Sequence, residues 1–243
     1  MGRITTLLVL AFSIGFLSFN LSATENTFQQ FYEQQNAAYA SYRSALFQTN
    51  KKDQPASLKG INNFSKQWDN IVVQFASNPP EIFADDPDWH STLTKISGIA
   101  AQGKKEIEAG ELSEAHETLE AIRDQLSSLR SRNKLIFFSD HVNNYHEFME
   151  HLLLAGYSKE NIDENAKNSI REQLAVLEYL SEKIVHQAPE NHKSDKVYIK
   201  LQAGLITSLK NLRKALDNNN AEGISKAISG LKPAYAKLFA KFG

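Results

Sequence analysis

The chain has 243 residues, a formal net charge of −1 and no cysteine. Without cysteine there are no disulfides, thiolate zinc sites or iron–sulfur clusters, and no covalently attached c-type haem, which needs a C-x-x-C-H motif. Lysine and arginine are interspersed with aspartate and glutamate. This pattern lacks the basic patch that nucleic acid or an anionic membrane surface would require, so we expect no nucleic-acid partner.

The first 23 residues have the layout of a secretory signal peptide. Arg3 precedes an apolar run from Ile4 to Phe19, and Leu21, Ser22 and Ala23 form a small-residue cleavage site. An uncleaved membrane anchor is the alternative, but serines and a glycine interrupt the run and no stop-transfer charges follow it. We predict export to a bacterial periplasm and a mature chain with no membrane span.

The rest of the chain repeats itself at the level of its apolar positions. A shift of 109 residues places Trp68 on Leu177, and a shift of 106 residues places Tyr39 on Tyr145. The matched positions are spaced by three, four and seven residues, as in the buried stripes of amphipathic helices. The pattern therefore predicts two similar helical units that arose by duplication.

Each unit is predicted to contain four helices, because the scarce glycines and prolines fall between long apolar-periodic segments. Asp86 and Pro87 predict an N-cap and a first helical position, and Gly110 predicts a C-cap. No glycine or proline lies between Arg130 and Phe138, so one continuous helix could link the units. The predicted helices span residues 26–49, 56–77, 87–109, 111–131, 135–155, 164–187, 195–217 and 220–241.

Long helices joined by short loops are typical of up-down-up-down four-helix bundles. We therefore predict an all-α protein of two tandem four-helix bundles after a signal peptide, with domains at residues 24–132 and 133–243. The apolar run Leu135–Phe138 lies at the domain boundary. The sequence leaves open whether this run is buried between the two units or shared with a second copy of the chain in a homodimer.

Residues 87–126 read PDWHSTLTKISGIAAQGKKEIEAGELSEAHETLEAIRDQL. The proline-led helix start, the apolar spacing from Trp89 to Ala100 and the short EAGELSEA turn resemble the third and fourth helices of the small soluble periplasmic b-type cytochrome, a four-helix bundle. That family holds haem with a methionine from its first helix and a histidine near the end of its fourth. Here the position matching that histidine is near Arg130, and neither unit keeps the pair, so the resemblance implies a haem-free relative.

The stretch HVNNYHEFMEH, residues 141–151, is the main candidate site. Copper and zinc take imidazole and carboxylate ligands, and copper also takes thioether sulfur. Side chains meet on one helix face at spacings of three or four, which pairs His146 with Met149 and with Glu150. His141 and His151 point away from His146 at about 100° per residue, so a site needs ligands from a neighbouring helix.

The preceding helix offers another such pair, His116 and Glu120. Two other interpretations stay open: the histidines lie on a solvated helix flank while Met149 packs in the core, or they form a pH-sensitive contact surface. The buried stripe is predicted at Phe138, Val142, Tyr145, Met149 and Leu152. The candidate metal ligands are His116, His141, His146, Met149 and Glu150.

No motif in the sequence indicates catalysis: there is no nucleophile with a base, no G-x-S-x-G and no phosphate loop. The acidic loop EIFADDPDWH, residues 81–90, lacks EF-hand spacing, and helix capping explains it. We predict a non-catalytic binding or scaffold protein, without a cofactor, that presents helix faces to a partner protein or a small ligand. The alternative is a periplasmic binding protein for Cu or Zn.

Overall fold

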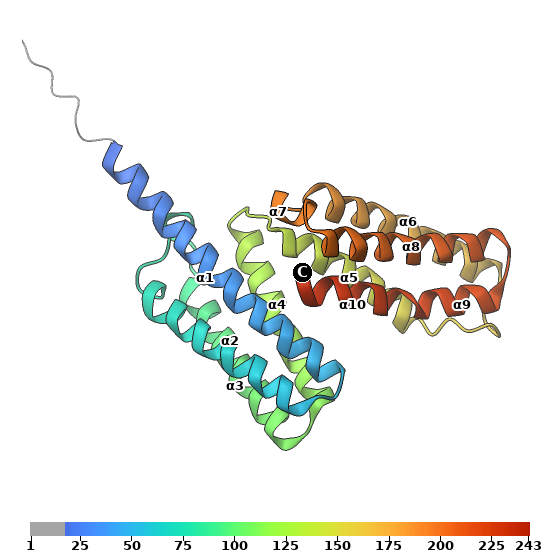
Figure 1. The fold of residues 1–243 in the computed structure, drawn as a ribbon, viewed down its shortest axis with the longest axis horizontal. Helices are drawn as coiled ribbons and strands as arrows, with labels where there is room; N and C mark the ends of the chain where they lie inside the picture. The colour runs from blue at the N-terminus through green and yellow to red at the C-terminus, as the bar shows by residue number, and fades with distance from the viewer. Residues whose placement is uncertain (1–17) are drawn as a thin grey trace, which may run out of the picture.

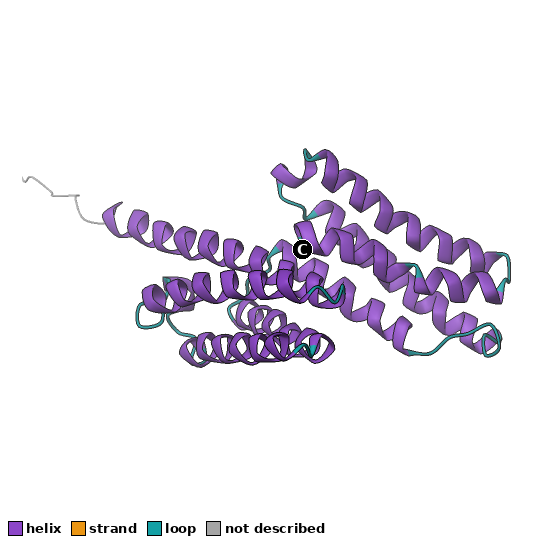
Figure 2. Cartoon of the chain, turned by 60° about the horizontal axis from the view of Figure 1, so that its bottom comes forward, coloured by secondary structure: helices purple, strands orange, loops and turns teal. Residues whose placement is uncertain are grey.

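The protein is built of α-helices throughout residues 18–243, the part of the chain that the computed structural model describes (Figure 2). Side chains are described from residue 27 onward. The prediction of an all-α fold is confirmed. Of the predicted signal peptide, residues 1–23, only residues 18–23 lie within the described part of the chain. The signal peptide therefore stays a prediction. Within the described residues, no helix is both long enough and apolar enough to cross a membrane.

The helices follow one another in two consecutive sets (Figure 1). The N-terminal set consists of α1 (Ser18–Asn50), α2 (Gln54–Phe75), the 3-10 turn η1 (Glu81–Phe83), α3 (Trp89–Ala109) and α4 (Leu112–Arg132). The C-terminal set consists of α5 (Phe138–Leu154), α6 (Glu164–His186), the short α7 (Glu190–Lys193), α8 (Lys196–Asp217), α9 (Ala221–Ser229) and α10 (Leu231–Phe242).

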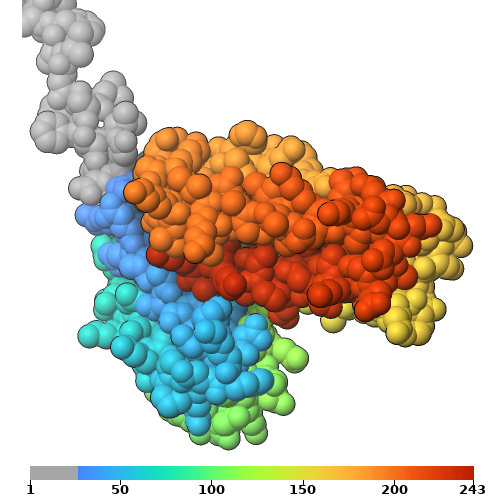
Figure 3. All heavy atoms as spheres, turned by 45° about the vertical axis from the view of Figure 1, so that its right-hand side comes forward, coloured from blue at the N-terminus to red at the C-terminus, as the bar shows by residue number. Residues whose placement is uncertain are grey.

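Helices pack mainly within their own set. In the N-terminal set α1 contacts α2 and α4, and α3 contacts the same two helices; in the C-terminal set α5 and α8 each contact α6 and α10. The two sets also touch, because α1 packs against α10 (Figure 3). The buried apolar side chains of both sets form one contiguous cluster. The division into domains at 24–132 and 133–243 therefore stays a prediction.

Local sequence explains several of the helix ends. The carboxylates of Asp53 and Asp163 accept backbone N–H groups of Ala56 at 3.0 Å and Ala166 at 2.8 Å, which caps α2 and α6. Gly110 ends α3 with φ +82°, a conformation that costs glycine little. The predicted cap at Gly110 is confirmed.

The start of α3 differs from the prediction. The helix begins at Trp89, so the assignment of Asp86 as its N-cap and Pro87 as its first residue is wrong. The Asp86 carboxylate instead accepts hydrogen bonds at 3.0 Å from Arg132 and 2.8 Å from Asn133 at the end of α4. The loop before α3 is thereby tied to α4 by partners that the local sequence does not reveal, while Asp86 also accepts the nearby Asp88 N–H at 3.0 Å.

The sequence left open whether one continuous helix links the two units, and the structure shows that none does. α4 ends at Arg132, Lys134 takes the left-handed conformation with φ +58°, and α5 begins at Phe138. A non-glycine residue with positive φ is unfavourable by itself. Local backbone hydrogen bonds close this turn, from the Lys134 N–H to the Ser131 carbonyl at 3.1 Å and from the Leu135 N–H to the Arg130 carbonyl at 2.9 Å.

A buried ion pair adds to the stability of this turn. The Arg130 guanidinium is 1% exposed, and its Nε donates to the Asp140 carboxylate oxygens at 2.8 and 3.0 Å. The same carboxylate accepts the Phe137 backbone N–H at 2.8 Å and so caps α5. One carboxylate thus joins the last turn of α4 to the first turn of α5 and closes the chain into a tight turn.

The helix predicted at 220–241 is interrupted. α9 ends at Ser229 and α10 begins at Leu231, with Gly230 between them. Pro233 has no N–H to donate to the carbonyl of Ser229, and its ring crowds that carbonyl. The interruption follows from this missing hydrogen bond. The prediction of one helix rested on the spacing of apolar residues alone and overlooked the effect of the proline.

The apolar run Leu135–Phe138 is divided between the two sets. The Phe137 ring lies 5.0 Å from the Tyr32 ring of α1, while Phe138 lies 6.1 Å from the Tyr198 ring of α8. Ile136 is 72% exposed. The run is therefore partly buried between the two sets. This agrees with the first of the two alternatives that the sequence left open.

Replacing Arg130 with alanine is expected to destabilise the protein by about 3–5 kcal/mol, because the Asp140 carboxylate would stay buried without its partner. The matched control is Arg213→Ala, which breaks an exposed pair with Glu178 and is expected to cost less than about 1 kcal/mol. Urea unfolding followed by circular dichroism measures both. Equal losses in the two variants would contradict the role given to Arg130.

Two glycine-to-alanine substitutions are expected to change the stability of the protein in opposite directions. A Cβ at Gly60 would lie 2.7 Å from the Ala45 backbone nitrogen, so Gly60→Ala must force α1 and α2 apart and cost about 1–3 kcal/mol. A Cβ at Gly98 meets no atom within 4 Å, so Gly98→Ala is expected to stabilise α3 by about 0.5–1 kcal/mol. Thermal unfolding of both variants checks this, and a stabilising Gly60→Ala would show that the two helices are not tightly packed there.

Candidate functional site

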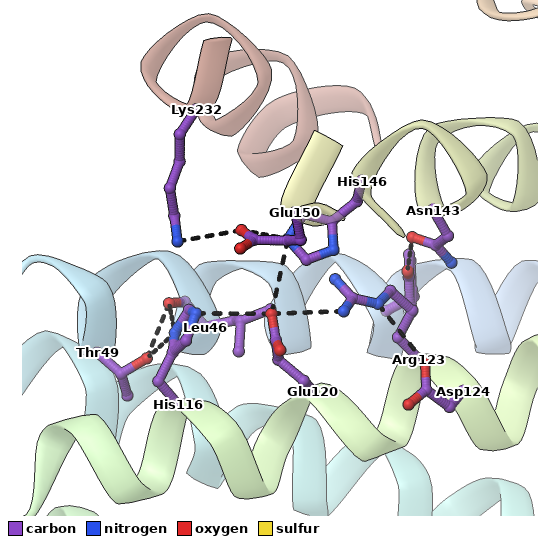
Figure 4. Close-up of polar contacts among 11 residues, drawn as sticks. Leu46, Thr49, His116, Glu120, Arg123, Asp124, Asn143, His146, Glu150 and Lys232 are labelled. Atoms are coloured by element: carbon purple, nitrogen blue, oxygen red, sulfur yellow. Dashed lines mark hydrogen bonds and ion pairs between the residues drawn. The ribbon is translucent and has the colours of Figure 1, made fainter. Parts of the chain in front are cut away.

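Two histidine–glutamate pairs face each other where the two helix sets meet (Figure 4). His116 and Glu120 lie one turn apart on α4, and His146 and Glu150 lie one turn apart on α5. Glu120 Oε1 is 3.7 Å from His116 Nε2 and 3.8 Å from His146 Nε2, and His146 Nε2 is 3.3 Å from Glu150 Oε1. We call these four residues the junction cluster.

Three of the five predicted candidates, His116, His146 and Glu150, therefore lie together. The spacing of the sequence indicated Glu120 only as a partner of His116. In the structure, Glu120 lies between His116 and His146 and contacts both imidazoles across the junction. The sequence offered the pair on the preceding helix as a possible source of further ligands but did not show that the two pairs meet. They meet because the chain turns at Arg130 and Asp140, which places α4 and α5 on the two sides of one groove.

Two cations adjoin the cluster. Arg123 of α4 places a guanidinium nitrogen 3.4 Å from Glu120 Oε1, and Lys232 of α10 places Nζ 3.2 Å from Glu150 Oε1. Each of the two carboxylates is thus balanced by a cationic side chain. Sequence spacing could have indicated Arg123, three residues after Glu120. It could not have indicated Lys232, which belongs to a distant helix.

The α1 helix fixes the orientation of His116. Its Nδ1 lies 3.1 Å from the Leu46 carbonyl oxygen and 3.0 Å from Thr49 Oγ1. Thr49 Oγ1 itself donates to that carbonyl at 2.8 Å, so Nδ1–H of His116 is placed to donate to these oxygens. Burial lowers the pKa of His116, against the attraction of Glu120. The neutral ring then turns the lone pair of Nε2 toward the Glu120 carboxylate.

His146 is buried rather than solvated. Its side chain is covered by the N-terminal set, and its ring lies 5.0 Å from the Tyr235 ring of α10. The interpretation of His146 as a residue on a solvated flank is wrong, because a second helix set covers that flank of α5. His151 does lie exposed on the same helix.

The other two candidates lie elsewhere. Met149 is fully buried in the apolar core with Val142, Tyr145 and Leu152, as the predicted stripe requires. His141 lies on the opposite side of α5, beside Asp140 and Lys134. Neither side chain belongs to the junction cluster.

The Glu150 carboxylate is strongly stabilised in its charged form. The contact with the His146 imidazole, together with the nearby Lys232 ammonium, outweighs the opposing effect of burial and lowers the pKa of Glu150 to about 2. At neutral pH this group is therefore a weak base, held in place by its partners.

An open groove of about 530 Å³ runs beside the cluster between α4 and α5. We call it the α4–α5 groove. Its lining carries four carboxylates and one guanidinium, so it is acidic although the whole chain is nearly neutral. The lining residues are Glu120, Arg123, Asp124, Ser127, Asn143, Asn144, His146, Glu147, Glu150, His151 and Leu154.

No protein family, curated protein or solved structure matches this chain. The similarity to the b-type cytochrome family therefore rests on the sequence pattern alone and stays a prediction. Within the described residues, no group of three or more histidine, aspartate or glutamate side chains has the arrangement of a ready-made metal site. The site must be interpreted from its own charges and distances.

The lowered pKa of Glu150 predicts a loss of stability in acid. The folded-state value of about 2 lies below the roughly 4.3 of an unfolded glutamate. The stabilisation is thus complete above about pH 5 and disappears as the pH falls toward 2. Glu150→Gln should be less stable than wild type at pH 7 and lose less stability between pH 5 and 2. Urea midpoints at several pH values measure this, and parallel curves would contradict it.

Proposed function

We propose that this protein is an exported, non-catalytic binding protein whose α4–α5 groove holds a basic segment of a partner protein. The observation that carries the proposal is the charge of the groove. Of its four carboxylates, Glu120 and Glu150 are balanced by Arg123 and Lys232, which leaves an excess of negative charge at the exposed Asp124 and Glu147, one from each helix set. A positively charged partner would complement this surface.

The shape and the rim of the groove support a peptide-like ligand. Leu154 is 80% exposed in the lining, and Phe148, with its ring 5.7 Å from the His151 ring, lies beside it. Exposed apolar side chains next to acidic ones suit an amphipathic helix with lysine or arginine on its flanks. The groove follows helix α5, which spans 17 residues, or about 25 Å.

The titration behaviour of the site supports binding rather than catalysis. A general base or acid works best when its pKa is near the working pH. The pKa of Glu150 is instead lowered to about 2, and its carboxylate is engaged by His146 and Lys232. The N-terminal sequence MGRITTLLVLAFSIGFLSFN supports export to the periplasm.

A charge-reversal variant tests the proposed groove. Asp124 and Glu147 are exposed in it, so Asp124→Lys/Glu147→Lys should preserve the fold while reversing the local charge. The probe is a fluorescent helical peptide with leucine on one face and lysine on its flanks. We expect at least a tenfold weaker affinity for the variant by fluorescence anisotropy, and weaker wild-type binding as salt rises.

The matched control changes the net charge equally on another surface. Glu172→Lys/Glu182→Lys alters two exposed residues of α6, outside the groove. This variant should bind the peptide like wild type. If it loses as much affinity as the groove variant, binding depends only on net charge and the proposal fails.

A further inference from the structure

We propose that the junction cluster binds one divalent transition-metal ion of the zinc or copper type, which bridges the two helix sets. His116 and Glu120 would come from α4, and His146 and Glu150 from α5. Two imidazoles and one or two carboxylates form a donor set that both metals accept. The cluster shares Glu120, His146 and Glu150 with the lining of the α4–α5 groove, but the test of the metal site changes neither Asp124 nor Glu147, on which the peptide test depends.

The spacing of the donor atoms is close to that of a coordination shell. Metal–ligand bonds of about 2.0–2.2 Å in tetrahedral geometry place neighbouring donor atoms roughly 3.3–3.6 Å apart. The three observed separations within the cluster are 3.3, 3.7 and 3.8 Å. Glu120 Oε1 lies within 3.8 Å of an imidazole nitrogen from each helix, so side-chain rotation would let an ion beside this oxygen take ligands from both α4 and α5.

The hydrogen bonds of His116 prepare its Nε2 as a ligand. Because Nδ1 is held by the Leu46 carbonyl and Thr49, the proton lies on that side and the lone pair of Nε2 faces the Glu120 carboxylate. Such hydrogen bonds from the remote ring nitrogen are typical of metal-bound histidine. Two acceptors that face each other at 3.7 Å repel, and a cation between them would remove this repulsion.

There is room for one water-sized species beside these atoms. A cavity of about 30 Å³ adjoins the cluster and is contacted by His116, Glu120 and His146. A volume of this size accommodates a water-sized species. The Lys232 ammonium, which now pairs with Glu150, is 44% exposed and belongs to a flexible side chain, so it can swing into solvent when an ion takes its place.

The duplication offers an independent reason to assign a function to these four residues. The shifts that align the two units place Ser225 on His116 and Ser229 on Glu120, and likewise Ala40 on His146 and Ser44 on Glu150. Each cluster residue thus matches a small side chain in the other unit. Helix packing by itself does not require histidine or glutamate at these positions.

Isothermal titration of the full, chelator-treated chain with Zn²⁺ tests the proposal. We expect about one ion per chain, and affinity at least tenfold weaker in His116→Ala and in His146→Ala. His151→Ala removes an exposed histidine of α5 outside the cluster and should bind like wild type. Circular dichroism of each variant checks that it is folded, and Glu120→Gln keeps the shape of the site if an alanine variant does not fold.

A second variant separates a metal site from a purely structural network. Lys232→Ala removes the ammonium that competes for Glu150, so Zn²⁺ should bind several-fold more tightly and raise the melting temperature further than in wild type. A structural ion-pair network predicts no such gain. The proposal is overturned if wild type takes up no Zn²⁺, if His151→Ala weakens binding as much as His146→Ala does, or if Lys232→Ala leaves the affinity unchanged.

Discussion

The buried pair of Arg130 and Asp140 is the constraint on which the relation of the two helix sets depends. Its guanidinium is almost fully buried, so the pair is stable only while both partners are present. Asp140 also caps α5 through the Phe137 N–H. Because one carboxylate performs both tasks, the chain must turn between α4 and α5, and the two helices diverge from this point with the groove between them.

The charges at the junction follow from this turn. It brings Glu120 of α4 beside His146 of α5, and α10 then adds Lys232 to Glu150. The result is a partly buried network in which each carboxylate has cationic or imidazole partners, next to a groove in which acidic side chains dominate. A chain with a formal net charge of −1 thus concentrates negative charge on one surface. Such a separation of charge favours recognition of a cation, whether a metal ion or a basic peptide.

The two units share a packing pattern but not a site. Tyr39 and Tyr145, which the repeat aligns, are both buried, as are Trp68 and Leu177. At the junction, by contrast, His146 matches Ala40 in the other unit. The duplication predicted from the sequence would account for the common apolar stripes, but not for the histidines and carboxylates of this contact surface. The contact of α1 with α10 joins the two helix sets, whose buried apolar side chains form one core.

The sequence by itself determined the helical class, the buried stripe of Val142, Tyr145, Met149 and Leu152, and the turn at Gly110, because periodicity and glycine conformation are local properties. It also indicated His116, His146 and Glu150, since residues four apart share a helix face. Only the tertiary structure decided that His146 is buried and that Lys232 reaches Glu150. Each of these depends on a partner distant in sequence, whose position is set by the packing of whole helices.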